Sequence, residues 1–448
     1  MRFELRPTLL SSPPPVFLCD NIVKVNFQAL GCRLNEAELE RWSSEFIQKG
    51  HHVTADSKDA DIIVFNTCSV TAEADRKSRN QINKIHKANP DSKLIVTGCY
   101  ASLQPQQVAQ HLGVDLVIAN SDKDSLTQQV QKAFNLSDLH AEQEIQSSLF
   151  ARGRHRAFIK IQDGCRYRCS FCIVTLARGD EKSQSEQSII DEINRHHEQG
   201  VNEVVITGVH VGGYGSDLGS SLYRLLSELL DKTTIPRIRL ASVEPWDLPD
   251  NFFELFHDQR LMPHMHLPLQ SGSDSVLRRM SRRCKTAEFS QLAEKARNSI
   301  PDFNITTDII VGFPGETEAE WRESLSFVEQ IGFGHIHIFS YSPRAGTKAA
   351  QMPHQISKEV KKQRNHEMHL LANQLKISAM ESIVGSSQNI LWERHVDTIR
   401  NIWTGYTPQY FKVLSNNSHN LESMITAAQI SGIDEEFQSL TALSPVYF

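Results

Sequence analysis

Strand-length apolar runs alternate with amphipathic, helix-length stretches along two long parts of the chain, and this alternation constrains the fold most. In the first part the apolar runs lie at 22–30, 61–66, 93–97 and 115–119, and helical patterns lie near 35–49, 72–89 and 104–112. Such βαβ alternation predicts a parallel sheet covered by helices. We therefore expect an α/β domain at 22–138, preceded by an untargeted leader at 1–21.

The second part repeats the alternation with more units. Its apolar runs lie at 157–162, 203–207, 237–242, 264–269, 305–311 and 335–341. Six strand–helix units predict a partial (βα)6 barrel of the TIM type, whose chemistry would lie at the carboxyl ends of the strands. We place this domain at 151–380, after a polar linker with some helix at 121–150, and expect it to end in a long helix at 354–382.

From residue 385 onward the pattern changes to short β-like runs with turns between them. These runs lie at 389–393, 410–414 and 424–430. They predict a small closed β barrel at 381–448. The predicted class is therefore α/β with three domains, which a length of 448 residues accommodates.

Charge and composition narrow the kinds of partner. No apolar run approaches the roughly 18 residues that span a bilayer, so we expect a cytoplasmic protein with no membrane partner. The net charge of −6 argues against a general nucleic-acid binder, yet residues 151–182 hold eight Lys and Arg against three Asp and Glu. That basic strip predicts one selective anion-binding surface, and an ordinary solvated face explains the charge equally well.

Three cysteines, Cys165, Cys169 and Cys172, form a Cys-x3-Cys-x2-Cys motif directly after the predicted strand at 157–162. Three thiolates on one short loop can hold three irons of a cubane cluster and leave the fourth iron open. A structural zinc site would need a fourth protein ligand, and His155 sits on the far side of the strand. The spacing therefore favours an open 4Fe–4S cluster over zinc.

Cys32, Cys68 and Cys99 share no local motif, but each follows the end of a predicted parallel strand. Since the carboxyl ends of parallel strands meet at one edge of a sheet, we expect the three thiols to converge there. Three buried structural cysteines are the alternative, but this placement favours a second open cluster. Cys19 and Cys284 fit neither set and are predicted not to be ligands.

Several longer motifs resemble those of the methylthiotransferases, radical S-adenosylmethionine enzymes that join a domain with an auxiliary cluster to a radical core and a C-terminal TRAM domain. The likeness covers about residues 22 to 430. The motifs that carry it are Gly31-Cys32-Arg33-Leu34-Asn35-Glu36-Ala37-Glu38, Asn66-Thr67-Cys68-Ser69-Val70-Thr71, Thr97-Gly98-Cys99, the Cys165 loop, His266-Leu267-Pro268-Leu269-Gln270-Ser271-Gly272-Ser273-Asp274 and Gly312-Phe313-Pro314-Gly315-Glu316.

Within that family, Gly31-Cys32-Arg33-Leu34-Asn35 is similar to the branch that acts on N6-threonylcarbamoyladenosine. The isopentenyladenosine branch usually has Gly-Cys-Gln-Met-Asn, and the branch that modifies a ribosomal protein usually has Gly-Cys-Pro-Lys-Asn. The chain departs from the family at Ile173-Val174-Thr175, usually Ile-Val-Pro, and at Lys182-Ser183-Gln184, usually Arg-Ser-Arg. Both segments flank the second cysteine triad and leave its ligands intact.

The resemblance implies methylthiolation of C2 of N6-threonylcarbamoyladenosine in the tRNA anticodon loop (position 37). Two 4Fe–4S clusters and two S-adenosylmethionine molecules would carry the chemistry, because no side chain can convert an aromatic C–H to C–S. It also implies a flavodoxin or ferredoxin as electron donor, and we expect a monomer. Isopentenyladenosine or a ribosomal protein is the alternative substrate, and a zinc-stabilised RNA-binding protein without catalysis is the alternative of another class.

The family also implies contacts around the clusters. By analogy, the cofactor S-adenosylmethionine would contact Thr207, Gly208, Glu244, Gln270 and Ser271, which follow predicted barrel strands. Candidate contacts to tRNA phosphates are Lys160, Arg166 and Arg168 beside the triad loop, with Arg278, Arg279, Arg282 and Arg283 as further candidates, and surface ion pairing is the alternative for each. Arg33 adjoins Cys32, and a guanidinium can bind a carboxylate through two hydrogen bonds, so we predict that it grips the substrate's carboxylate. The alternative is that Arg33 ties down its own loop or pairs with Glu36.

Overall fold

The computed structural model describes residues 22–138, 155–434, 436 and 438–443. The predicted leader, Cys19 and part of the predicted linker lie outside these residues. The chain forms two compact units, which we call the N-terminal unit (Met1–Tyr167 with Cys172–Glu181) and the C-terminal unit (Arg168–Phe171 with Lys182–Phe448). In the described part of the chain, every helix is too short or too polar to cross a membrane.

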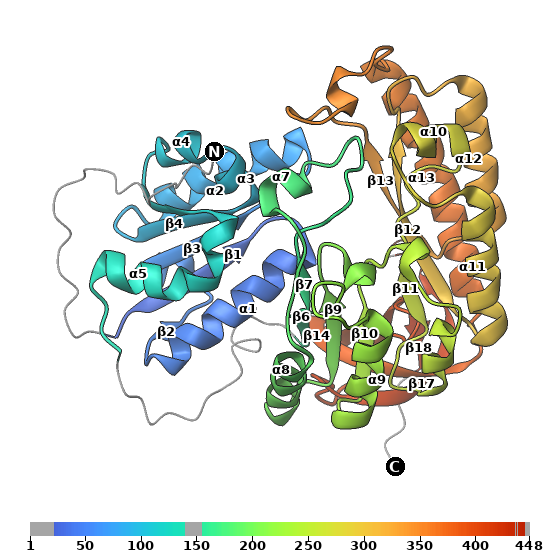
Figure 1. The fold of residues 1–448 in the computed structure, drawn as a ribbon. Coiled ribbons are helices and arrows are strands. Elements are labelled where there is room, and N and C mark those ends of the chain that lie inside the picture. The colour runs from blue at the N-terminus through green and yellow to red at the C-terminus, as the bar shows by residue number, and fades with distance from the viewer. Residues whose placement is uncertain (1–21, 139–154, 435, 437, 444–448) are drawn as a thin grey trace. The chain divides into compact units, whose positions relative to one another are not determined.

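The N-terminal unit contains a parallel five-stranded sheet in the order β2-β1-β3-β4-β5. Its strands are β1 (Lys24–Ala29), β2 (His52–Val53), β3 (Ile62–Thr67), β4 (Lys93–Gly98) and β5 (Val114–Ile118). The helices are α1 (Arg33–Gln48), α2 (Ala72–Ala88), α3 (Cys99–Leu103), α4 (Pro105–Ala109) and α5 (Leu126–Phe134), as Figure 1 shows. The predicted parallel-sheet α/β domain is confirmed.

Helices cover both faces of this sheet, which explains why β3 begins with four consecutive apolar residues. Ile62 and Val64 of β3 pack in one core with α1 and α5. Ile63 and Phe65, which alternate with them, pack in a second core with α2, α3 and α4. Because successive side chains point to opposite faces of a strand, the four residues fill two cores from one short run.

The helix predicted near 104–112 corresponds to α4, which is shorter, and a further short helix that was not predicted, α3, precedes it. α3 ends at Leu103, and α4 begins at Pro105, in its first position. Proline lacks an N–H and fixes its own φ, so it begins a helix well but cannot continue one. The N-terminal unit also contains β6 (Arg156–Lys160), β7 (Gln162–Asp163) and α7 (Val174–Arg178).

The C-terminal unit contains five parallel strands of the predicted barrel, β9 (Glu203–Thr207), β10 (Arg237–Leu240), β11 (His264–His266), β12 (Asn304–Val311) and β13 (His335–Ser340). β9 pairs with β10, and β11, β12 and β13 pair in that order. A parallel bridge between Ser242 and His266 joins the two groups. The helices of this unit are α8 (Glu186–Glu198), α9 (Leu222–Lys232), α10 (Asp274–Arg279), α11 (Thr286–Ser299), α12 (Glu318–Ile331) and α13 (Lys358–Glu381).

The last part of this unit is a closed barrel in the order β14-β15-β16-β18-β17. Its strands are β14 (Ser387–Asp397), β15 (Ile402–Tyr406), β16 (Lys412–Asn416), β17 (Ile425–Asp434) and β18 (Ser439–Ala442). Its core contains Trp392, Val413 and Ile430. The small closed β barrel is confirmed, although β15 and β18 were missed. Gly405 weakens the strand pattern of β15 in sequence, because glycine is depleted in strands.

Candidate functional site

Three cysteines lie at the carboxyl edge of the N-terminal sheet. Cys32 is the N-cap of α1, Cys68 directly follows β3, and Cys99 is the first residue of α3 after β4. The three preceding strands are neighbours in the sheet, with Ala29 paired to Asn66 and Thr67 to Gly98. Because these strands are adjacent and parallel, the three cysteine loops meet at one edge of the sheet.

Two glycines make room for this arrangement. A Cβ on Gly31 would lie 2.5 Å from Cβ and 2.7 Å from Sγ of Cys68, and one on Gly98 would lie 2.3 Å from the Thr67 carbonyl oxygen. Both glycines have positive φ, 111° and 101°, which side chains rarely adopt. The loops that carry the thiols can therefore approach each other only with glycine at these positions.

Cys68 and Cys99 are buried, whereas Cys32 is exposed. Burial raises the pKa of the Cys68 thiol to about 11, against the opposing effect of hydrogen bonds from the backbone N–H groups of Val70 and Ser69. A buried thiol of this kind ionises when a metal replaces its proton. Backbone donors already aimed at the sulfur would then stabilise the thiolate, so the donor set fits an iron–sulfur cluster.

Asn35 fixes two of the cysteine loops to each other. Its Nδ2 donates to the carbonyl oxygen of Leu30 at 2.8 Å and to that of Thr67 at 3.2 Å. Leu30 lies two residues before Cys32, and Thr67 lies directly before Cys68. The Cys32 thiol also contacts Oδ1 of Asn35, at 3.6 Å. On the third loop, Nδ2 of Asn120 donates to Sγ of Cys99 at 3.8 Å.

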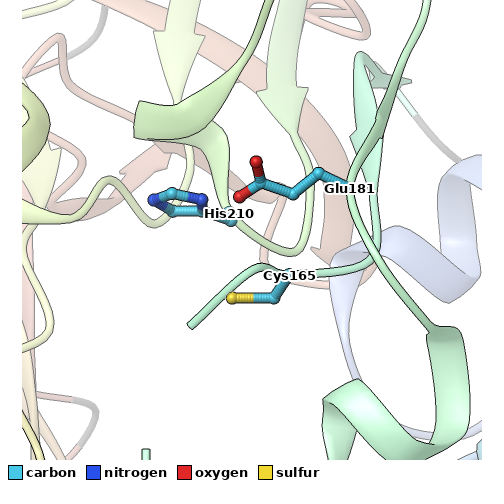
Figure 2. Close-up of side chains that lie close together, drawn as sticks. All are labelled: Cys165, Glu181 and His210. Carbon is cyan, nitrogen blue, oxygen red and sulfur yellow. The ribbon is translucent and has the colours of Figure 1, made fainter. Parts of the chain in front are cut away.

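The second cysteine motif lies on the loop between β7 and α7. In the N-terminal unit, the Cys165 N–H donates to the carbonyl oxygen of Gly179 at 3.1 Å, which closes the loop at its base. Figure 2 shows the Cys165 thiol and the Glu181 carboxylate of this segment. Arg166, predicted to contact phosphates, is exposed and lies 3.6 Å from Oε2 of Glu181. Lys160 is instead mostly buried and pairs with carboxylates at 2.6 and 3.2 Å.

Cys169 belongs to the C-terminal unit, together with exposed Arg168. Nη1 of Arg282 donates to Sγ of Cys169 at 3.8 Å, and the guanidinium lies over the Trp246 ring, 4.4 Å from its centroid. The Nε–H of Arg282 is buried without a hydrogen-bond partner among the described residues. An unpaired buried donor of this kind indicates that the site accepts a further polar group.

Glu244, predicted as a cofactor contact, lies in a polar cluster beyond the carboxyl ends of β9 and β10. Nε2 of His210 lies 2.6 Å from Oδ2 of Asp247 and 3.7 Å from Oε2 of Glu244. His210 is also drawn in Figure 2. Burial raises the pKa of Glu244, while His210 and Arg282 oppose that shift. Groups with shifted pKa values are common at functional sites, so the cluster makes this end of the strands a candidate binding site.

The other four predicted cofactor contacts lie at the same ends of the strands. Thr207 is the last residue of β9, and Gly208 follows it. Gln270 has a positive φ of 78°, and its backbone bridges to β12 at Asp308 and Ile310. The Ser271 hydroxyl is directed elsewhere, because its Oγ lies 3.0 Å from Oγ of Ser324 on α12.

The sequence patterns did not mark four polar residues that lie after strands of the two units, namely Asn35, Asn120, His210 and Asp247. Asn35 stood inside the quoted Gly31–Glu38 motif, and its spacing of three residues from Cys32 places it on the first turn of α1. His210 and Asp247 follow strand ends, where barrel chemistry is expected. Nothing in the local sequence of Asn120 marks it, since its partner Cys99 lies 21 residues away.

Comparison with known proteins identifies both parts of the chain. Residues 24–119 match an uncharacterised protein family, UPF0004, and residues 159–328 match the Radical SAM superfamily. A solved radical S-adenosylmethionine methyltransferase, TsrM from Kitasatospora setae, shares the fold at a TM-score of 0.57 and 13% identity, over 74% of this chain and 77% of that one.

Two curated relatives are similar over most of their length. The threonylcarbamoyladenosine tRNA methylthiotransferase MtaB of Bacillus subtilis is 34% identical over 91% of this chain and 93% of the relative. The tRNA-2-methylthio-N(6)-dimethylallyladenosine synthase of Oceanobacillus iheyensis is 32% identical over 86% of this chain and 77% of the relative.

The barrel strands, the cysteine loop and the superfamily match together define a radical S-adenosylmethionine enzyme. The relatives that match over most of the chain specify the family: the chain belongs to the methylthiotransferases, in the threonylcarbamoyladenosine branch. It is therefore an enzyme that transfers a sulfur-containing group.

Proposed function

We propose that this enzyme methylthiolates C2 of N6-threonylcarbamoyladenosine in the tRNA anticodon loop, with two 4Fe–4S clusters. The observation that carries the proposal is the pair of three-cysteine sets, one at the carboxyl edge of the N-terminal sheet and one on the loop before α7. Three protein ligands leave one iron of each cluster open. When bound, the clusters and S-adenosylmethionine supply the radical chemistry and the methylthio group.

The chain's own residues would bind and orient these groups. Cys32, Cys68 and Cys99 would hold one cluster, and Cys165, Cys169 and Cys172 the other. Glu244, Gln270, Thr207 and Gly208 would contact S-adenosylmethionine, with the unpaired Nε–H of Arg282 available to a polar atom of the cofactor or substrate. Exposed Arg166 and Arg168 would bind tRNA phosphates. The electron would come from a flavodoxin or ferredoxin.

Nucleoside mass spectrometry of total tRNA tests the substrate. We expect cells without the gene to lose 2-methylthio-N6-threonylcarbamoyladenosine and to accumulate its precursor, and we expect the gene on a plasmid to restore the product. If the cells instead lose methylthiolated isopentenyladenosine, the substrate is the nucleoside named for the Oceanobacillus relative and the proposed substrate is wrong. Unchanged profiles of both nucleosides would rule out tRNA as the substrate.

Iron content tests the two clusters separately. Anaerobic reconstitution should give about eight irons per chain, and the triple variant Cys165→Ala/Cys169→Ala/Cys172→Ala should give about four. Gly31→Ala should also give about four, because the added Cβ would lie 2.7 Å from Sγ of Cys68. Gly332→Ala is the matched control: its φ is 67°, but nothing lies within 4 Å of the added Cβ, so it should retain about eight. About four irons in the unmodified protein would contradict the proposal of two clusters.

A further inference from the structure

A buried group of charged side chains lies beside the N-terminal cysteines. It consists of Glu38, Lys123, Lys160, Asp163 and Arg178, whose side chains are 2 to 19% exposed. Three cations therefore face two carboxylates, which leaves one positive charge in excess within this ion-paired group. An uncompensated charge away from water is costly, so its presence indicates a negative partner nearby.

Arg178 donates hydrogen bonds to three residues. Its Nη1 donates to Glu38 at 3.0 Å and to Asp163 at 2.9 Å. Its Nη2 donates at 2.9 Å to Oδ1 of Asn35, the same oxygen that the Cys32 thiol contacts. Burial would lower the pKa of Arg178, but Glu38, Cys99, Asp163 and Cys32 outweigh it and raise the pKa well above its usual value. Through this shared Asn35 oxygen, the guanidinium lies one side chain away from the Cys32 sulfur.

Lys123 approaches the site from another side of the same unit. Its Nζ donates to Glu38 at 2.6 Å and to Oδ1 of Asn66 at 3.2 Å. Asn66 is the second residue before Cys68, and its Nδ2 donates back to Glu38 at 2.8 Å. Glu38 thus accepts from all three cations of the group, and Arg178, Lys123 and Lys160 overcome the effect of burial and lower its pKa well below normal.

Arg178 also connects this site to the base of the second cysteine loop. It lies six residues after Cys172, at the end of α7. Its partner Asp163 lies two residues before Cys165 and accepts the Gly164 N–H at 2.8 Å. The guanidinium is thereby held from both ends of that loop, and its planar fork is fixed by three acceptors.

We propose that Arg178 is a positioning residue that places a fixed buried positive charge against the N-terminal cluster and raises its reduction potential. The inference rests on the proposed N-terminal cluster. Each reduction adds one electron, and therefore one negative charge, to the cluster. A nearby cation stabilises the reduced form more than the oxidised form, and it does so strongly where water is excluded. Glu38 would have the opposite effect on the potential.

The test uses the full chain with Cys165→Ala/Cys169→Ala/Cys172→Ala, so that the N-terminal cluster alone remains. Its midpoint potential is measured by dithionite titration followed by electron paramagnetic resonance. Adding Arg178→Gln should lower the ratio of reduced to oxidised cluster at a fixed potential about tenfold, which is 59 mV for one electron. Adding Glu38→Gln should raise that ratio. Arg76→Gln is the charge-matched control, since Arg76 is 64% exposed, and should leave the potential unchanged.

Opposite shifts for Arg178→Gln and Glu38→Gln separate an electrostatic role from a structural one, because structural damage would not reverse sign. If Arg178→Gln fails to take up iron, Arg178→Lys keeps the charge and should retain the potential, while Glu38→Gln still must raise it. Iron-loaded variants whose potentials match the control, or shift in the same direction, overturn this inference alone. A triple-cysteine background without iron overturns the N-terminal cluster and this inference with it.

Discussion

Cys68→Ala should abolish methylthiolation while the enzyme still cleaves S-adenosylmethionine. Cys68 follows β3 directly and contributes to the N-terminal set, whereas the cysteines of the second motif lie on a separate loop. Losing one of three thiolates leaves two irons without protein ligands, which should release the N-terminal cluster. The measurement is 5′-deoxyadenosine formation under dithionite, run beside the assay for methylthiolated tRNA nucleoside.

Cys284→Ala is the matched control for that experiment. Cys284 is also a buried free cysteine, but its thiol donates to the carbonyl oxygen of Lys285 and belongs to neither set. We expect it to keep both activities and full iron content. Methylthiolation by Cys68→Ala at the unmodified rate would refute the role of the N-terminal cluster. Loss of both activities would contradict the prediction that Cys68 belongs to a site separate from the one that cleaves S-adenosylmethionine.

Much of the fold could be predicted because the longer parallel strands coincide with short apolar runs in the sequence. The apolar run at 61–66 predicts a strand, and β3 forms at Ile62–Thr67 with its side chains buried on both faces. The location of Cys68 at the edge of the sheet could be predicted because Cys68 follows that run and the carboxyl ends of parallel strands lie at one edge. Weak patterns failed: β2 has two residues, and β18 has four with only Leu440 strongly apolar. β2 and β18 form because they pair with neighbouring strands, and a short window of sequence gives no information about that pairing.

The charged group around Arg178 could not be predicted for a different reason. Glu38 and Arg178 lie 140 residues apart in sequence, and Glu38 and Lys123 lie 85 apart. Charged side chains are usually solvated, so a Glu on a helix and a Lys after a strand indicate surface positions. Lys160 illustrates this point, because its place in a basic strip predicts a phosphate contact, yet its ammonium pairs with Glu38 and Asp163. Only the tertiary structure makes these residues neighbours.

Arg33→Gln should weaken binding of threonylcarbamoylated tRNA roughly 30- to 1000-fold, which corresponds to about 2–4 kcal/mol for a shielded ion pair. Arg33 is the first residue of α1 and adjoins Cys32. Its guanidinium lies 5.9 Å from the centroid of the Phe158 ring, so the side chain is half-buried with an apolar surface beside it. Threonylcarbamoyladenosine carries a carboxylate that isopentenyladenosine lacks, and a guanidinium can bind it through two parallel hydrogen bonds.

The experiment compares both tRNA types and checks iron content in the same preparations, because Arg33 neighbours a proposed ligand. We expect Arg33→Gln to keep its iron and to lose the preference for the carboxylate-bearing tRNA. Arg41→Gln is the control on the same helix, since Arg41 is 43% exposed and pairs with Glu45 and Asp124. An exposed pair is worth little, so this change should alter neither affinity. If Arg33→Gln binds threonylcarbamoylated tRNA as tightly as the unmodified enzyme does, Arg33 serves its own loop and Phe158, and the carboxylate is recognised elsewhere.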